Sequence, residues 1–221
     1  MSVKDCGYHK YERRKLLRRI FAGVLGFIVL VLLVILLIWV ILRPTKPRFL
    51  LQDVTVHVFN VSTSGASPSP TSPTPNTVTV TMQATLLAHN PNDQIGVYYQ
   101  NLDVYASYRN QQISLATVLP PTYQDHNDDT VWSPFLCGNA VPVSPYVLSA
   151  LQQDQSAGGM LVNVKVNGRV KWKVGTWTSG RYHLYVNCPA YIRFPGDPNM
   201  TIGVVGTAIK FQILQSCSVD V

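Results

Sequence analysis

The sequence predicts an antiparallel β-sandwich that follows a single transmembrane helix near the amino terminus. Residues 20–42 form an uninterrupted apolar run, which is typical of a membrane span. From about residue 50 onwards, apolar and polar side chains alternate with a period of two in several short segments, which is typical of strands with one buried face. About seven or eight such strands over roughly 170 residues indicate a sandwich.

The apolar run reads IFAGVLGFIVLVLLVILLIWVIL, which is 23 residues without a charged side chain. A helix of this length covers roughly 34 Å, and the hydrocarbon core of a bilayer is about 30 Å thick. A cleaved signal peptide has a shorter apolar stretch that ends in small residues, whereas Arg43 and Lys46 follow closely here. We therefore expect a retained membrane anchor at residues 20–42.

The basic charge of the chain is concentrated before this run. Residues 1–19 contain seven basic and two acidic side chains, so they carry +5 of the chain's formal charge of +7. The positive-inside rule therefore predicts a cytoplasmic tail at residues 1–19 and an extracytoplasmic domain at residues 43–221. The bilayer is the partner that this layout implies. A nucleic-acid partner is not expected, because the large domain is close to neutral.

The predicted extracytoplasmic side permits disulfides and N-linked glycans. Cys137, Cys188 and Cys217 lie there, and their spacing allows three pairings without choosing among them. The two glycosylation sequons, at Asn60 and Asn199, are consistent with the same topology.

Residues 62–77, STSGASPSPTSPTPNT, are rich in serine, threonine and proline. Such a composition cannot build a packed core and stays extended. The segment is either a carrier of O-linked sugar or a bare flexible loop between two strands, and the sequence does not choose between them.

Strand-like alternation recurs along the domain. It predicts strands at residues 77–86, 102–108, 182–186 and 209–213. An earlier strand is expected to place Val54, Val56 and Val58 on one face, with His57 and Phe59 on the other. Residues 144–155 look helical instead, because Ser144 suits the N-cap and Pro145 suits the first helical position.

The clearest local turn signal is Asn167-Gly168, which lies between the alternating segments 162–166 and 169–174. Asn-Gly tolerates the positive φ angles of a type I′ turn, so we expect a tight hairpin there. Its outward face carries four basic side chains, Lys165, Arg169, Lys171 and Lys173. We interpret this row as a solvated strand face and not as a phosphate-binding patch, since no stacking aromatic residues interleave with it.

No catalytic or metal-binding motif is evident. The histidines are scattered, and neither an HExxH motif, paired cysteines, a G-x-S-x-G elbow nor a glycine-rich phosphate loop occurs. The segment Asp125-His126-Asn127-Asp128-Asp129 is rich in oxygen ligands that suit calcium, but it lacks EF-hand spacing, and turns favour Asp and Asn. We interpret it as a polar loop, and we predict neither an enzyme nor a cofactor.

A series of short motifs spans nearly the whole chain. The series comprises PTKPRF at 44–49, Asn90-Pro91-Asn92 followed by Gly96, Tyr98 and Tyr99, YRNQQI at 108–113, PPTYQ at 120–124, WSPF with Trp132, Pro134 and Phe135, GRVKWKVG with Gly168, Trp172 and Gly175, SGRYHLYVNC at 179–188, and Cys217-Ser218-Val219. In these motifs the chain resembles the plant harpin-induced and non-race-specific disease resistance-like family. The domain of that family is a type-2 late-embryogenesis-abundant domain, also called a water stress and hypersensitive response domain.

The resemblance implies a fibronectin/immunoglobulin-like β-sandwich on a membrane stalk, at the plasma membrane and within it at plasmodesmata. It implies a non-enzymatic role in defence, the hypersensitive response and stress signalling, or in adhesion between membrane and wall, with protein partners that it does not identify. It also implies a disulfide between Cys188 and Cys217, which leaves Cys137 as a free thiol.

An alternative function is a lipid-binding or membrane-tethering module, because sandwiches with apolar grooves can hold acyl chains. A large apolar cavity would support this alternative, and a filled core would count against it. Homo-oligomerisation through the span stays open, since Gly23 and Gly26 lie three residues apart and miss the small-xxx-small spacing.

Overall fold

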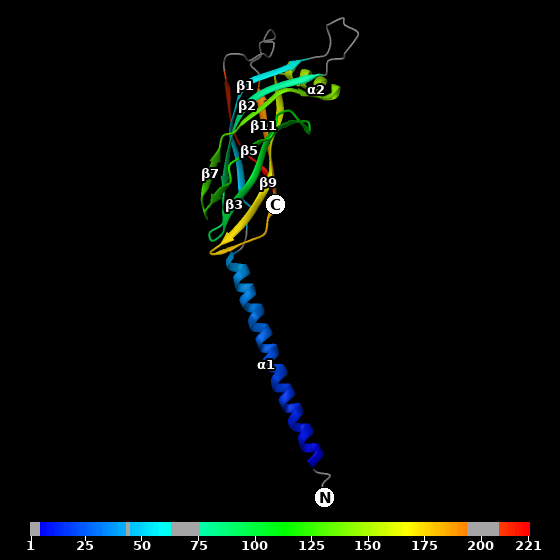
Figure 1. Ribbon diagram of the computed structural model, residues 1–221, viewed down its shortest axis with the longest axis vertical. Coiled ribbons are helices and arrows are strands. Elements are labelled where there is room, and N and C mark those ends of the chain that lie inside the picture. The colour runs from blue at the N-terminus through cyan, green and yellow to red at the C-terminus, as the bar shows by residue number, and fades with distance from the viewer. Residues whose placement is uncertain (1–4, 43–44, 63–75, 194–207) are drawn as a thin grey trace. The chain divides into compact units, whose positions relative to one another are not determined.

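The computed structural model describes residues 5–42, 45–62, 76–193 and 208–221 (Figure 1). The chain divides into two compact units, Met1–Arg43 and Pro44–Val221. Most of the Ser/Thr/Pro-rich segment 62–77 and the sequon at Asn199 lie outside the described residues.

The first unit is the helix α1, Asp5–Leu42. Its stretch Lys15–Leu37 is long and apolar enough to cross a membrane, and all of its side chains are exposed. A helix that is apolar on every face and covered by no other part of its unit is suited to lipid. The predicted membrane helix is therefore confirmed as a candidate span. The helix begins inside the basic tail, whose Lys, Arg, Glu and Leu residues are good helix formers.

The second unit is built mainly from antiparallel strands in two sheets, which confirms the predicted fold class. The five-stranded sheet has the order β12-β1-β2-β7, and β8 also pairs with β2. Its strands are β1 (Arg48–Ser62), β2 (Thr77–His89), β7 (Asp129–Trp132), β8 (Phe135–Pro142) and β12 (Ile209–Ser216).

The eight-stranded sheet has the order β13-β11-β9-β3-β4, with β5 and β6 also on β3 and β10 on β9. Its strands are β3 (Gly96–Tyr108), β4 (Gln111–Gln112), β5 (Thr117–Leu119), β6 (Thr122–Gln124), β9 (Gly159–Val174), β10 (Trp177–Thr178), β11 (Tyr182–Arg193) and β13 (Ser218–Asp220). The helix α2, Pro145–Ser156, precedes β9. As predicted, Ser144 caps it, and its hydroxyl accepts a hydrogen bond from the Val147 amide at 3.3 Å.

The core lies between the inner faces of the two sheets. In β2, every second residue from Val78 to Ala88 is buried, and in β9 the valines at 162, 164, 166 and 170 are buried. Three aromatic rings pack together in one part of this core. Trp132 stacks on Phe49 with ring centroids 6.4 Å apart, and it contacts Tyr99 edge-on with ring centroids 5.3 Å apart. The space between the sheets is thus occupied by packed apolar side chains.

One predicted side-chain orientation in β1 is wrong. The register of β1 against β2 shifts between Val56 and Val58, which is a β-bulge. The extra residue turns Phe59 inward, where it is 2 % exposed, and leaves Val58 only half-buried. Phe59 therefore joins Val54 and Val56 in the core.

The predicted hairpin at Asn167-Gly168 is also wrong, because β9 runs through both residues as one long strand (Figure 1). The strand pairs with β11 on one side and β3 on the other, and these long-range pairings outweigh the local turn preference. The tight turn comes later, at Gly175, which has a φ of 56° between β9 and β10.

Gly168 has a different role, which is to let β3 approach. The register between β3 and β9 shifts between Gln100 and Asp103, so a bulge in β3 faces Gly168. A Cβ atom on Gly168 would lie 2.8 Å from the carbonyl oxygen of Asn101 and against the Leu102 side chain. A glycine inside a strand commonly marks such a close approach.

The substitution Gly168→Ala is expected to lower the free energy of unfolding by about 1–3 kcal/mol, because the new methyl group meets backbone as well as a side chain. The matched control is Gly180→Ala, since Gly180 has no positive φ and open space around its Cβ position. Thermal unfolding of the full-length chain in detergent, followed by near-ultraviolet circular dichroism, measures both. Equal unfolding midpoints for the two variants would contradict the assigned role.

Candidate functional site

The outer face of the eight-stranded sheet carries a row of polar side chains. Because the valines of β9 face the core, the residues between them point outward. Cross-strand pairing places Arg169 between Gln100 of β3 and His183 of β11. In the same way, Asn167 lies between Asp103 and Tyr185.

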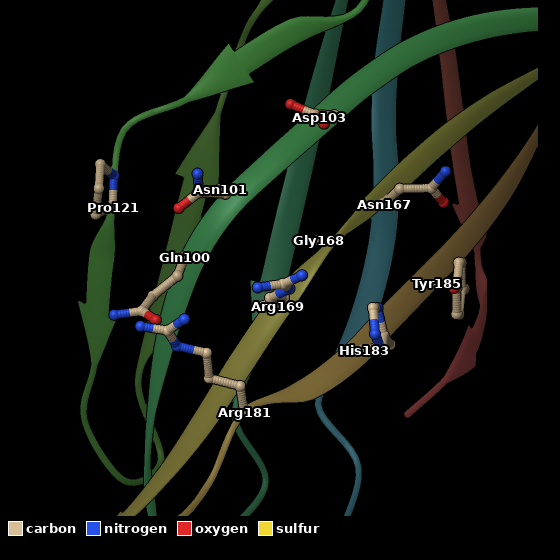
Figure 2. A pocket seen from close by; sticks show the side chains of 10 residues that line it. All are labelled: Gln100, Asn101, Asp103, Pro121, Asn167, Gly168, Arg169, Arg181, His183 and Tyr185. Carbon is tan, nitrogen blue, oxygen red and sulfur yellow. The ribbon is translucent and has the colours of Figure 1, made fainter.

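These side chains line a groove with a volume of about 600 Å³. Figure 2 shows the guanidinium groups of Arg169 and Arg181 in it, together with the rings of His183 and Tyr185. The two rings are stacked, with centroids 6.1 Å apart and an angle of 12° between their planes. The full lining is Gln100, Asn101, Asp103, Pro121, Asn167, Gly168, Arg169, Arg181, His183 and Tyr185.

A second groove, of about 420 Å³, adjoins the first and shares Asn167 and Tyr185 with it. Lys165 lies in this second groove, where its ammonium group donates to the Asn110 side chain at 3.2 Å. Tyr105, Asn163, Val186, Asn187, Ser218 and Asp220 also line it. We call the two grooves together the trough.

Most cations of the trough have no acidic partner. The ion pairs among the described residues involve Lys46, His89, Arg109, His126 and Lys210, none of which lines the trough. The guanidinium groups of Arg169 and Arg181 form neither a hydrogen bond nor an ion pair with the part of the chain that the structure describes. Two guanidinium groups thus share one groove with a single carboxylate, that of Asp103.

The basic row was interpreted as a plain solvated face because no aromatic residues interleave with it, and this reason is wrong at Lys173. Lys173 lies over the rings of Tyr98 and Tyr123, at 5.8 and 4.9 Å from their centroids. These rings come from β3 and β6, so the sequence of β9 alone does not reveal them.

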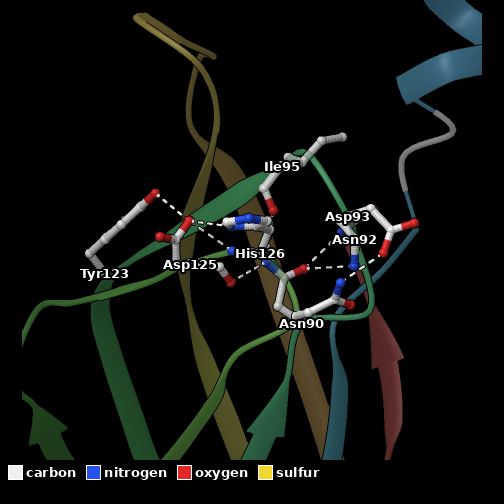
Figure 3. A network of polar contacts seen from close by, with 8 residues as sticks. Asn90, Asn92, Asp93, Ile95, Tyr123, Asp125 and His126 are labelled. Atoms are coloured by element: carbon white, nitrogen blue, oxygen red, sulfur yellow. Dashed lines mark hydrogen bonds and ion pairs between the residues drawn. The ribbon is translucent and has the colours of Figure 1, made fainter.

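A separate asparagine network holds Asn90 and Asn92 in the interior of the domain (Figure 3). The Asn90 side chain donates to the carbonyls of Ile95 and Asp125, at 2.7 and 2.8 Å, and accepts from the side chain of Asn92 at 2.8 Å. Asn92 in turn binds the backbone of Thr45 through both its carbonyl oxygen and its amide. These buried polar groups are satisfied within the protein, which indicates a structural role.

The segment 125–129 forms a polar loop beside this network. The Asp125 carboxylate accepts hydrogen bonds from the ring and then from the backbone amide of His126, which lower the pKa of Asp125. Burial, followed by the nearby Asp125 charge, raises the pKa of Tyr123. Asp129 contacts His89 at 2.7 Å. The acidic side chains of Asp125 and Asp129 are therefore each engaged with a neighbouring histidine.

Two core tyrosines also have raised pKa values. Burial raises the pKa of Tyr99, whose hydroxyl donates to Gln124 at 2.8 Å. Burial and the neighbouring Asp154 raise the pKa of Tyr108 to about 12. The Tyr108 hydroxyl thereby fastens β3 to α2, so both tyrosines serve the fold.

Most motif residues of the resemblance stabilise the scaffold. A Cβ on Gly96 would lie 2.5 Å from the hydroxyl oxygen of Tyr123, and Trp132 packs in the core. Pro134 accepts a hydrogen bond from Ala84, while Phe135 is half-exposed. The trough is lined in part by other members of the same motifs, including Gly168 and Arg169 of GRVKWKVG and three residues of SGRYHLYVNC, namely Arg181, His183 and Tyr185.

The trough residues Gln100, Asp103, Arg181 and Tyr185 were not predicted as site residues. Gln100 and Asp103 come from β3 and Tyr185 from β11, while Arg181 directly precedes β11, and only the pairing of β3 and β11 with β9 brings them together. The signal that was available was the run of basic residues along β9.

Cys188 and Cys217 form a disulfide, the pairing that the resemblance implies, while Cys137 is exposed and free. The disulfide links β11 to the residue before β13. Asn60 is exposed near the end of β1.

Comparison with known proteins gives consistent matches. The family model described as Late embryogenesis abundant protein matches residues 85–188. "NDR1/HIN1-like protein 1" of Arabidopsis thaliana is 48% identical over 99% of this chain and 100% of its own length. From the same organism, "NDR1/HIN1-like protein 12" is 45% identical over the whole of both chains, and "NDR1/HIN1-like protein 26" is 37% identical over 77% of this chain and 75% of its own. With this identity, its β-domain and its apolar helix, the chain belongs to the NDR1/HIN1-like family of late embryogenesis abundant proteins, which is related to plant disease resistance.

Proposed function

We propose that the protein acts at the plasma membrane in plant defence and stress signalling, through an extracytoplasmic β-domain and without enzymatic chemistry. The observation that carries this proposal is the disulfide between Cys188 and Cys217. Disulfides persist in oxidising compartments and are rare in the cytosol. A domain that follows a membrane helix and contains a disulfide is therefore expected on the outer side.

The distribution of charge supports the same orientation. Seven basic residues precede the apolar run, and Arg43, Lys46 and Arg48 follow it closely. The excess on the amino-terminal side favours a cytoplasmic tail. The exposed sequon residue Asn60 is then available for glycosylation, and we expect its use there.

The lipid-binding alternative gains no support from the described part of the domain. The space between the sheets holds packed apolar side chains, and the trough is lined mainly by polar residues. An acyl chain requires an apolar cavity instead. Protein partners in signalling remain part of our proposal, and the experiment below addresses location first.

The orientation predicts that protease added to intact plant protoplasts removes the domain of the full-length chain, and that glycosidase increases its mobility on a gel. The matched control replaces five basic residues of the tail, Arg13, Arg14, Lys15, Arg18 and Arg19, by glutamine. This variant is expected to insert in mixed orientation, because the charge asymmetry is lost. A wild-type domain that protease reaches only after permeabilisation would overturn the proposal.

The defence role has its own readout. Silencing expression of the protein is expected to reduce ion leakage during the hypersensitive response. Expression of the wild-type protein in the silenced tissue is expected to restore the leakage. A chain with a scrambled, charged span in place of residues 20–42 is expected not to restore it. Normal ion leakage in silenced tissue would contradict the defence role, whatever the orientation of the domain.

A further inference from the structure

The side chains that line the trough have the chemistry of a ligand-binding site, and a structural role in the fold does not account for them. We propose that the trough binds acidic polysaccharide, with uronate carboxylates on Arg169 and Arg181 and a sugar ring packed on Tyr185. The inference rests on the proposed function only for the location of the domain, because the binding itself can be measured with purified protein.

Charge complementarity is the first argument. Of the eleven basic residues that follow position 19, five lie on or beside this face: Lys165, Arg169, Lys171, Lys173 and Arg181. The acidic residues that line the trough are Asp103 and Asp220. The guanidinium group presents a planar fork of donors that matches a carboxylate. Since the guanidinium groups of Arg169 and Arg181 lack partners in the described part of the protein, an anionic ligand would offset their mutual repulsion.

Exposed rings and amides are the second argument. Tyr185 is 53% exposed and stacks on His183, so one broad aromatic surface faces solvent. Aromatic rings offer a flat apolar surface to the C–H face of a sugar. The side chains of Gln100, Asn101 and Asn167 each contain both donors and an acceptor. Such groups suit the closely spaced hydroxyls of a saccharide.

The shape of the trough favours a chain-like ligand. The two grooves meet at Asn167 and Tyr185, so the surface continues along β9 from Arg169 to Asn163. These seven residues of extended strand, with six steps of about 3.3 Å between them, cover about 20 Å, which accommodates several consecutive sugar units. Along this path, basic and amide side chains alternate, in the order Arg169, Asn167, Lys165 and Asn163.

Other anionic partners fit this surface less well. A peptide interface needs an apolar centre, but Pro121 and Val186 are the apolar side chains that line the trough, apart from its rings. A nucleic-acid interface is typically part of a strongly basic domain, whereas residues 20–221 carry eleven basic and nine acidic side chains. An acidic saccharide therefore uses the features that are present.

The test measures binding to the full-length protein in nanodiscs of uncharged phosphatidylcholine, by biolayer interferometry. The probe is an oligogalacturonate of about ten sugars, and its fully methyl-esterified form is the uncharged control. We expect the acidic form to bind, the esterified form to bind at least tenfold more weakly, and affinity for the acidic form to fall as salt is raised.

The decisive variant is Arg169→Gln with Arg181→Gln, which is expected to lower affinity at least tenfold. Its control, Arg48→Gln with Lys210→Gln, removes the same charge outside the trough and is expected to keep wild-type affinity. Tyr185→Ala is expected to weaken binding about fivefold, while Tyr185→Phe and the exposed Tyr191→Ala keep it.

Absence of wild-type binding, equal binding of the esterified probe, or equal losses in the two charge variants would each overturn the proposal. These results do not depend on which side of the membrane the domain occupies. If protease reaches the domain only after permeabilisation while the protein still binds the acidic probe, the proposed location is refuted and the proposed saccharide site is supported.

Discussion

Replacing Asn90 by alanine is expected to lower the free energy of unfolding of the β-domain by about 3–5 kcal/mol. The Asn90 side chain is fully buried and serves the carbonyls of Ile95 and Asp125 and the amide of Asn92. Alanine leaves these three groups without their partner in a place that water does not reach. Each buried polar group left unsatisfied costs about 1–3 kcal/mol.

The matched control for Asn90→Ala is Asn139→Ala. Asn139 is exposed in β8, its φ is not positive, and its side chain forms no hydrogen bond with the part of the chain that the structure describes. Alanine therefore leaves no buried group without a partner, so we expect a change below about 0.5 kcal/mol. Chemical denaturation of the full-length chain in detergent, followed by near-ultraviolet circular dichroism, compares the two. Similar midpoints would show that the asparagine network does not stabilise the domain.

Removing the disulfide by Cys188→Ser with Cys217→Ser is expected to lower the free energy of unfolding by about 3–4 kcal/mol. The bond joins residues separated by 29 positions, and the estimate comes from the chain entropy that closing a loop of this length removes from the unfolded state. Reduction of the wild-type protein should give the same loss.

The exposed free thiol provides the control for this second prediction. Cys137→Ser is expected to leave stability within about 0.5 kcal/mol of wild type and to leave the effect of reductant unchanged. If reductant does not shift the unfolding midpoint of the wild-type chain, the bond between Cys188 and Cys217 does not contribute as the structure indicates.

The scaffold and the trough use different side chains, although some of both belong to the family motifs. Motif residues such as Asn90, Gly96 and Trp132 satisfy buried groups or permit close packing. The trough depends on outward-facing residues such as Arg181 and Tyr185, which belong to the motif SGRYHLYVNC but do not pack in the core. Matching the family motifs therefore predicts the domain, and the ligand has to be inferred from the trough itself.

The sequence by itself determined the elements whose causes are local. An unbroken apolar run requires a helix in lipid, because the backbone must satisfy its own hydrogen bonds there. Alternation with a period of two specified the buried face of β2, and Ser144 with Pro145 specified the start of α2. The motifs also carried the family, including the pairing of Cys188 with Cys217.

Only the tertiary structure decided the features that depend on strand pairing. Asn167-Gly168 has the local preference of a turn, yet hydrogen bonding to β3 and β11 on both sides keeps it extended. The bulge that turns Phe59 inward depends on the register against β2. The trough arises in the same way, because sheet neighbours are far apart in the chain. No local pattern could therefore place Arg169 beside His183 and Gln100.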